Sequence, residues 1–180
     1  MNLSLKPHPL IAHWVPGFVL LLMILLSAFD WRYESLIARI PSELHSASLI
    51  IFALAVLAFV SGQFLDAVRN GLIEECWDYC EEKRQIQQLN WGFFFDGDEA
   101  QLKHLHEHYF TWYVANLNLS LAIVFGGAVS LVLALYRNYP WHLILPVTIG
   151  IVAVIVIFMR DASGLRKEIK DNINRCYTTK

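Results

Sequence analysis

Four long runs of apolar residues alternate with polar segments along the chain. The runs cover residues 11–29, 47–65, 113–136 and 141–159, and each has about the 20 residues that a helix needs to cross a hydrocarbon core. Aromatic residues gather at the ends of these runs, where amphipathic rings prefer the headgroup region: Trp14, Trp31, Trp112, Tyr113, Tyr136 and Trp141. The pattern predicts four membrane-spanning helices.

The polar segment after the second run also has the pattern of a helix. No proline interrupts residues 66–89, so this segment would continue the second run as one helix over 47–89. At 1.5 Å per residue such a helix would be about 65 Å long, roughly twice the thickness of a hydrocarbon core. About half of it is therefore expected outside the bilayer.

Further polar segments flank the last two runs. Residues 99–113 read as a helix that leads into the third run, and one face of the C-terminal segment carries Leu165, Ile169, Ile173 and Cys176. We expect an all-α fold: an integral membrane four-helix bundle that forms a single polytopic domain over 1–180. Residues 66–112 and 160–180 would form a small cytoplasmic helical subdomain.

The basic residues predict the orientation of the chain. The segment 160–180 has six basic and three acidic residues, whereas the turn 137–140 has Arg137 alone. This places the C-terminus in the cytoplasm, and the N-terminus with it, because four is an even number of spans. Arg32 and Arg39 in the outer loop reduce this bias without reversing it.

Composition agrees with a membrane protein. Hydrophobic residues make up 56% of the chain, charged residues only 17%, and the mean hydropathy is +0.44. Soluble domains contain about 25% charged residues. We therefore expect a multi-pass protein of the cell membrane (the inner membrane in a bacterium), with the lipid bilayer as its first partner.

Charge and motifs exclude several kinds of function. A net charge of −2 argues against a nucleic-acid partner, because phosphate binding needs clustered Lys and Arg. Three cysteines cannot all pair, so we expect free thiols in a reducing compartment. The sequence has no Walker A, G-x-G-x-x-G or G-x-S-x-G motif, and we expect no cofactor.

A polar stripe follows the helix that leaves the second run. Its members fall within an arc of about 80° on an ideal helix: Gln63, Asp66, Asn70, Glu74, Trp77 and Glu81. Ionisable groups in the hydrocarbon are costly and often functional, but only Gln63 lies clearly within the predicted core. The stripe is therefore interpreted as a seam for packing, assembly or conduction.

The two predicted inner helical segments carry opposite charge. Residues 66–84 contain six acidic and three basic residues, a net charge of −3, and residues 160–180 have a net charge of +3. These segments are expected to pack against each other or to bind the same partner.

A pair of histidines suggests a different kind of site. His104 and His108 are one helical turn apart, and His-x3-His on a helix can supply two ligands to a metal. Glu74 or Glu75 would supply a third, in a site where metal-activated water hydrolyses a lipid bond. Histidines near a membrane surface are more often solvated, so no metal site is assigned with these residues.

Amide and small residues occupy one part of the third run. They are Asn116, Asn118, Ser120, Gly126, Gly127 and Ser130. In lipid, small residues let helices approach closely, and amides form hydrogen bonds across the contact. Packing explains this set better than substrate binding, and the contact lies either within one chain or between chains.

Two functions follow from these patterns. The favoured hypothesis is a homo-oligomeric, pore-like or signalling and effector component, which binds a cytoplasmic protein through 66–112 and 160–180. Its pore or assembly seam would contain Gln63, Asp66, Asn70, Asn116, Asn118 and Ser120. The alternative is an intramembrane metal-dependent or acid–base enzyme for a lipid or prenyl substrate, with Glu74, Glu75, His104 and His108 as its catalytic residues.

In outline, four spans with inner termini and a small cytosolic helical unit resemble membrane components of bacterial defence systems. The Kiwa membrane subunit and pore-forming CRISPR accessory proteins share this arrangement. The resemblance is one of architecture alone and implies an antiviral role without assigning any site residue.

Overall fold

The computed structural model describes residues 10–28, 47–84 and 99–178, and nearly all of them are helical. The elements form four continuous helical rods. The first consists of η1 (Leu10–Trp14) and α2 (Val15–Ala28), and the second of α4 (Ala47–Val68), η3 (Arg69–Glu74) and α5 (Glu75–Lys83). The third consists of α7 (Glu99–Leu105), η4 (His106–Phe110) and α8 (Thr111–Tyr136), and the fourth is α9 (Trp141–Thr178). The expectations for Trp31, Arg32, Arg39 and 85–98 lie outside the described residues, as does the side chain of Cys176.

The predicted fold class is confirmed. Within the described residues, four helices are long and apolar enough to cross a membrane, and each contains one of the four apolar runs. The second rod continues past its apolar part as predicted, and its helix is described as far as Lys83. The chain is a multi-pass membrane protein.

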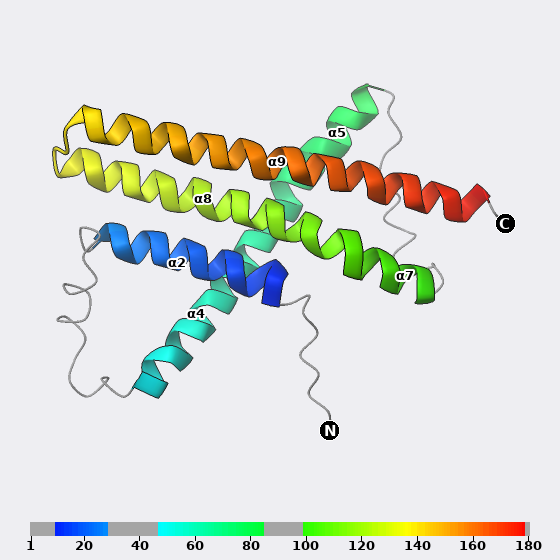
Figure 1. Ribbon diagram of the computed structural model, residues 1–180, viewed down its shortest axis with the longest axis horizontal. Helices are drawn as coiled ribbons and strands as arrows, with labels where there is room; N and C mark the ends of the chain where they lie inside the picture. The colour runs from blue at the N-terminus through cyan, green and yellow to red at the C-terminus, as the bar shows by residue number, and fades with distance from the viewer. Residues whose placement is uncertain (1–9, 29–46, 85–98, 179–180) are drawn as a thin grey trace.

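Three of the rods lie side by side and the fourth crosses them. Figure 1 shows α2, α8 and α9 nearly parallel, with α8 between the other two, while α4 with η3 and α5 runs obliquely across them. One end of the bundle, here named the polar end, holds η1, η3, α5, η4 and the last part of α9. The opposite end, the turn end, holds Ala28 and the turn 137–140.

Glycines set the point at which α2 and α4 cross. A Cβ on Gly17 would lie 1.8 Å from the carbonyl oxygen of Ala58, and a Cβ on Gly62 would lie 2.0 Å from that of His13. Only residues without a side chain permit this approach of two backbones, as in other small-residue contacts between membrane helices. The crossing brings the end of α4 beside η1.

The better-packed core lies at the polar end. Its fully buried side chains come from η1, α7, α8 and α9: Ala12, Leu105, Tyr113, Val114, Leu117, Ala162, Ile169 and Ile173. The apolar part of α9, by contrast, is almost entirely exposed to the surroundings, which are lipid for a spanning helix. Burial of apolar surface is favourable where water is the alternative, and it gains little where lipid is.

Candidate functional site

Three of the four rods contain a π-helical turn at the polar end. These turns are η1, η3 and η4. A π turn has one more residue than an α turn, so that residues five positions apart lie side by side. In η3 the guanidinium of Arg69 therefore lies beside the carboxylate of Glu74, with an Nη1–Oε1 distance of 2.8 Å.

Glu74 is the centre of a buried charge cluster. Besides Arg69, it accepts a hydrogen bond from the hydroxyl of Tyr113, whose oxygen lies 2.7 Å from Oε2. Arg166 donates from Nη1 to the same Oε2 at 2.7 Å. Arg69, Glu74 and Arg166 are only 4%, 5% and 3% exposed. One carboxylate thus connects η3, α8 and α9.

Arg166 extends the cluster to α5. Its Nη2 donates to Asp78 and, at 3.1 Å, to Glu81. Lys170, one turn further along α9, lies 2.5 Å from the other oxygen of Glu81. The guanidinium also lies over the ring of Trp77, 5.4 Å from its centroid, in a cation–π contact. The predicted packing of the oppositely charged segments is confirmed by these contacts.

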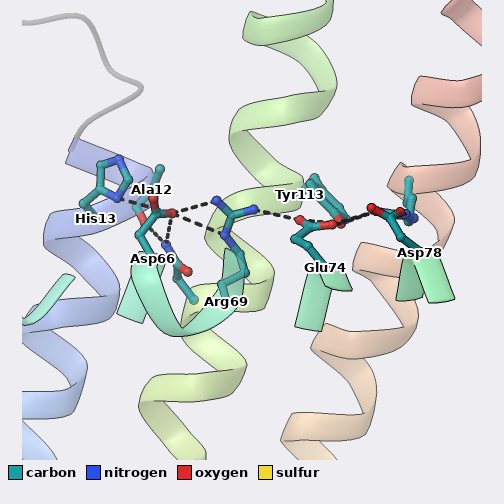
Figure 2. A network of polar contacts seen from close by, with 9 residues as sticks. Ala12, His13, Asp66, Arg69, Glu74, Asp78 and Tyr113 are labelled. Carbon is teal, nitrogen blue, oxygen red and sulfur yellow. Dashed lines mark hydrogen bonds and ion pairs between the residues drawn. The ribbon is translucent and has the colours of Figure 1, made fainter. Parts of the chain in front are cut away.

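Asp66 forms the other end of the cluster, where α4 meets α2. Arg69 donates to its carboxylate at 2.8 Å, and Nδ1 of His13 lies 3.9 Å away. Asn118 from α8 donates to the backbone oxygen of Ala12 at 2.8 Å and to Asp66 at 3.4 Å. Figure 2 shows these groups in a row that continues from His13 through Asp66 and Arg69 to Glu74.

The charges of the cluster nearly cancel. Its four carboxylates (Asp66, Glu74, Asp78 and Glu81) face three cations (Arg69, Arg166 and Lys170), a net charge of −1 with His13 neutral. Buried charges persist in proteins when they are paired in this way.

Glu81 lies well past the apolar part of its helix. Burial favours the neutral form of its carboxyl, but the hydrogen bonds from Arg166 and Lys170 outweigh burial, so the pKa of Glu81 is lower than usual. Near neutral pH this residue is therefore a carboxylate that attracts both cations.

The expected polar stripe divides into two groups. Asp66, Glu74 and Glu81 belong to the cluster, and Trp77 stacks on Tyr113 at a centroid distance of 6.2 Å. Gln63 and Asn70 are exposed and have no part in it. The π turn of η3 changes the register of Glu74 relative to the part of the helix before it, where both Gln63 and Asp66 lie.

The amide residues of α8 contact other helices of the same chain. Asn116 donates to Asp161 of α9, and Asn118 is held against η1 and α4 as described. The hydroxyl of Ser120 donates to the backbone oxygen of Asn116 within α8. A Cβ on Gly126 would lie 2.8 Å from the Met23 side chain, so this glycine permits close packing of α2.

The four residues of the enzyme hypothesis lie in different surroundings. His104 and His108 are exposed, with ring centroids 4.4 Å apart, and Glu75 is exposed on α5. Glu74 is buried and engaged by Arg69, Arg166 and Tyr113. Among the described residues, no group of three or more His, Cys, Asp or Glu side chains is placed to hold a metal ion.

Sequence reasoning paired Asp66 with Arg69 or with a residue on another helix, and the structure shows the pair with Arg69. It did not identify Arg166 or Tyr113 as members of the cluster. Arg166 was counted only as a charge, and Tyr113 was expected only as an aromatic at the end of a span, whereas its side chain is fully buried within the protein. The signal for Arg166 was its position one residue after Leu165, next to the apolar face of the C-terminal helix.

Comparison of the chain with protein-family models, with curated proteins and with solved structures finds no match. Its function is therefore inferred from the geometry of the chain itself.

Proposed function

We propose that this chain is a non-enzymatic signalling or effector component of the cell membrane, in which a cytoplasmic helical unit controls how the spans pack. The observation that carries this proposal is the Glu74 carboxylate, which accepts hydrogen bonds from Arg69, Tyr113 and Arg166. These donors belong to η3, α8 and α9, so a movement of α5 acts on two spans at once. The cytoplasmic location follows from the distribution of basic residues.

The chemistry of the cluster supports a conditional contact rather than simple stabilisation. Buried ion pairs contribute little net stability compared with apolar residues of similar size, yet breaking one leaves an uncompensated charge. Such a contact suits a two-state element, because a competing charge can replace one partner. A cytoplasmic protein with an acidic segment would compete with Glu81 and Asp78 for Arg166, and would release α5 from α9.

The pore-like form of this function needs a seam between copies of the chain. Asn116 and Asn118 give that seam no support, since both contact helices of their own chain. Gln63 is exposed on α4 and stays a candidate for such a contact. The signalling form of the function depends only on the cluster, and we propose it for that reason.

The neighbouring residues Glu74 and Glu75 provide a matched pair of variants for the test. Spin labels on Glu82→Cys and Lys167→Cys, in a background without native cysteines, report the separation of α5 from α9 in liposomes. A thiol at the turn end, Tyr139→Cys, reports by its labelling rate whether the spans repack. Residues 82, 139 and 167 are all exposed.

We expect Glu74→Gln to broaden the distance distribution between the labels and to change the labelling rate at position 139. Glu75→Gln, which removes an exposed carboxylate, should change neither. If Glu74→Gln separates α5 from α9 while labelling at the turn end and ion flux stay as in the parent, the cluster is a local contact only. The proposed function would then be wrong.

A further inference from the structure

The side of α5 that faces away from the charge cluster is exposed and partly apolar. Tyr79 is 65% exposed, and Leu72 in the preceding turn is 61% exposed. Cys76 and Cys80 lie on the same exposed part of the helix. The opposite face is the one occupied by the cluster and its contacts: Glu74, Trp77, Asp78 and Glu81. Large apolar groups that protrude from the polar end require an explanation.

The charges around Tyr79 are arranged so that the face is complementary to itself. Glu75 precedes Tyr79 by four residues and Lys83 follows it by four, so the three lie along one side of α5. An acidic group at one end and a basic group at the other match a second copy of the same face, provided that the second helix runs in the opposite direction. Such self-matching is what a two-fold symmetric contact requires.

The path of α5 makes this contact geometrically possible. Figure 1 shows the rod of α4, η3 and α5 crossing α8 and α9, with α5 protruding beyond α9. Two copies in one membrane share their orientation, so a two-fold axis between them runs along the spans. The direction of α5 is oblique to the spans. Rotation about this axis therefore reverses the component of that direction that lies in the membrane plane, so two copies of α5 that meet at the axis cross each other.

We propose that this face of α5 is an interaction surface for a second copy of the chain, with Tyr79 at the two-fold axis. Glu75 of each copy then pairs with Lys83 of the other. Helices that lie on a membrane surface instead are typically rich in Lys and Arg on their polar face. The face of α5 carries Glu75 and Glu82 against Lys83, which favours the protein partner. The surface lies outside the cluster and does not depend on the function proposed above.

Cross-linking of the full-length chain in liposomes at low protein-to-lipid ratio tests this surface. The background has serine in place of Cys76, Cys80 and Cys176. We expect oxidation of Tyr79→Cys to give a disulfide-linked dimer in high yield, because position 79 meets its own copy at the axis. Lys167→Cys, an exposed position on α9, is the control and should give only the yield of random collision.

Charge reversal tests the pairing itself. Glu75→Lys and Lys83→Glu, each made alone in the Tyr79→Cys background, should lower the dimer yield about fivefold, because symmetry repeats each unfavourable pair twice. The double variant should restore the yield, since positions 75 and 83 are too far apart along one helix to pair within a copy. Both side chains are exposed, so melting temperatures should stay close to that of the parent.

Three results would each overturn the proposal. They are a yield for Tyr79→Cys no higher than for Lys167→Cys, single reversals without effect, and a double variant that is not restored. Quenching of a fluorophore at position 79 by lipid-attached quenchers would also overturn it, because the face would then lie against the membrane. None of these results would alter the test of Glu74.

Discussion

Arg69 and Glu74 are five positions apart on one helix and form an ion pair at 2.8 Å. In a regular α-helix, side chains three or four positions apart are neighbours, and the fifth points elsewhere. The π turn of η3 brings this pair together, and Glu74 can then accept hydrogen bonds from Tyr113 and Arg166 as well. Single π turns are frequent at functional sites, and this one shapes the charge cluster.

Deletion of Gly71 tests the role of the π turn. A π turn resembles an α-helix with one residue inserted, so the deletion should restore a regular helix without rotating the residues that follow. Glu74 would then follow Arg69 by four positions and still lie beside it. A Cβ at Gly71 would meet nothing within 4 Å, so no packing contact is removed. We expect the melting temperature in detergent to change by no more than a few degrees.

Deletion of Cys76 is the control for this experiment. It removes an exposed residue from the regular helix α5 and rotates the following residues by about 100°. Asp78 and Glu81 would turn away from Arg166, and the melting temperature should fall strongly. Equal effects of the two deletions would show that the π turn has no special role.

Replacement of Arg166 by methionine should destabilise the protein strongly. Three carboxylates, Glu74, Asp78 and Glu81, would lose a partner, and removal of one member of a buried ion pair costs about 3–5 kcal/mol. Lys167→Met, at the exposed neighbouring position, should change stability by no more than about 0.5 kcal/mol. Reversible unfolding in mixed micelles measures both values, and a small loss for Arg166→Met would contradict the cluster.

Replacement of Gly17 by alanine should separate α2 from α4. The added Cβ would lie 1.8 Å from the carbonyl oxygen of Ala58, which belongs to the backbone and cannot rotate away. Gly164→Ala is the matched control, because a Cβ there meets nothing within 4 Å and alanine favours a helix by up to about 1 kcal/mol. We expect opposite shifts of melting temperature, downward for Gly17 and slightly upward for Gly164.

Replacement of Asn118 by leucine should cost about 1–3 kcal/mol. The amide is fully buried and donates to the backbone oxygen of Ala12, which would lose its side-chain donor. Gln63→Leu, at an exposed position of α4, should be neutral or slightly stabilising in lipid. The same unfolding assay compares the two. Equal stability of both variants would show that Asn118 does not hold η1 in place.

The contact of Glu81 with Arg166 and Lys170 should depend on pH. Its pKa is lower in the folded protein than in the unfolded chain, so its stabilising effect is complete above about pH 4.5 and is lost as the pH falls through the folded pKa. The melting temperature of Glu81→Gln should therefore lie below that of the parent at pH 7, and the gap should begin to narrow only as the pH falls below about 4.5. A constant gap would mean that the carboxylate charge is not what matters.

The sequence by itself determined the spans and the nature of the polar end. Apolar runs of about 20 residues require helices in lipid, since each backbone polar group must be paired within its own segment. The spacing of Leu165, Ile169 and Ile173 likewise placed one face of α9 in a core, and both isoleucines are buried. The opposite charges of the segments 66–84 and 160–180 predicted that these helices pack together or bind the same partner, and the structure shows that they pack together.

Only the tertiary structure decided which polar residues meet. Gln63 and Asn70 share the stripe of Glu74 on an ideal helix, but the π turn changes the register between them. The oblique course of α4 depends on the close contact of Gly17 with the backbone of Ala58. The hydrophobic periodicity of either helix does not reveal such a contact between two backbones. A periodicity argument assumes the same number of residues per turn along the whole helix, and it considers one helix at a time. The cluster instead depends on the π turn, where the number of residues per turn changes, and on contacts between different helices.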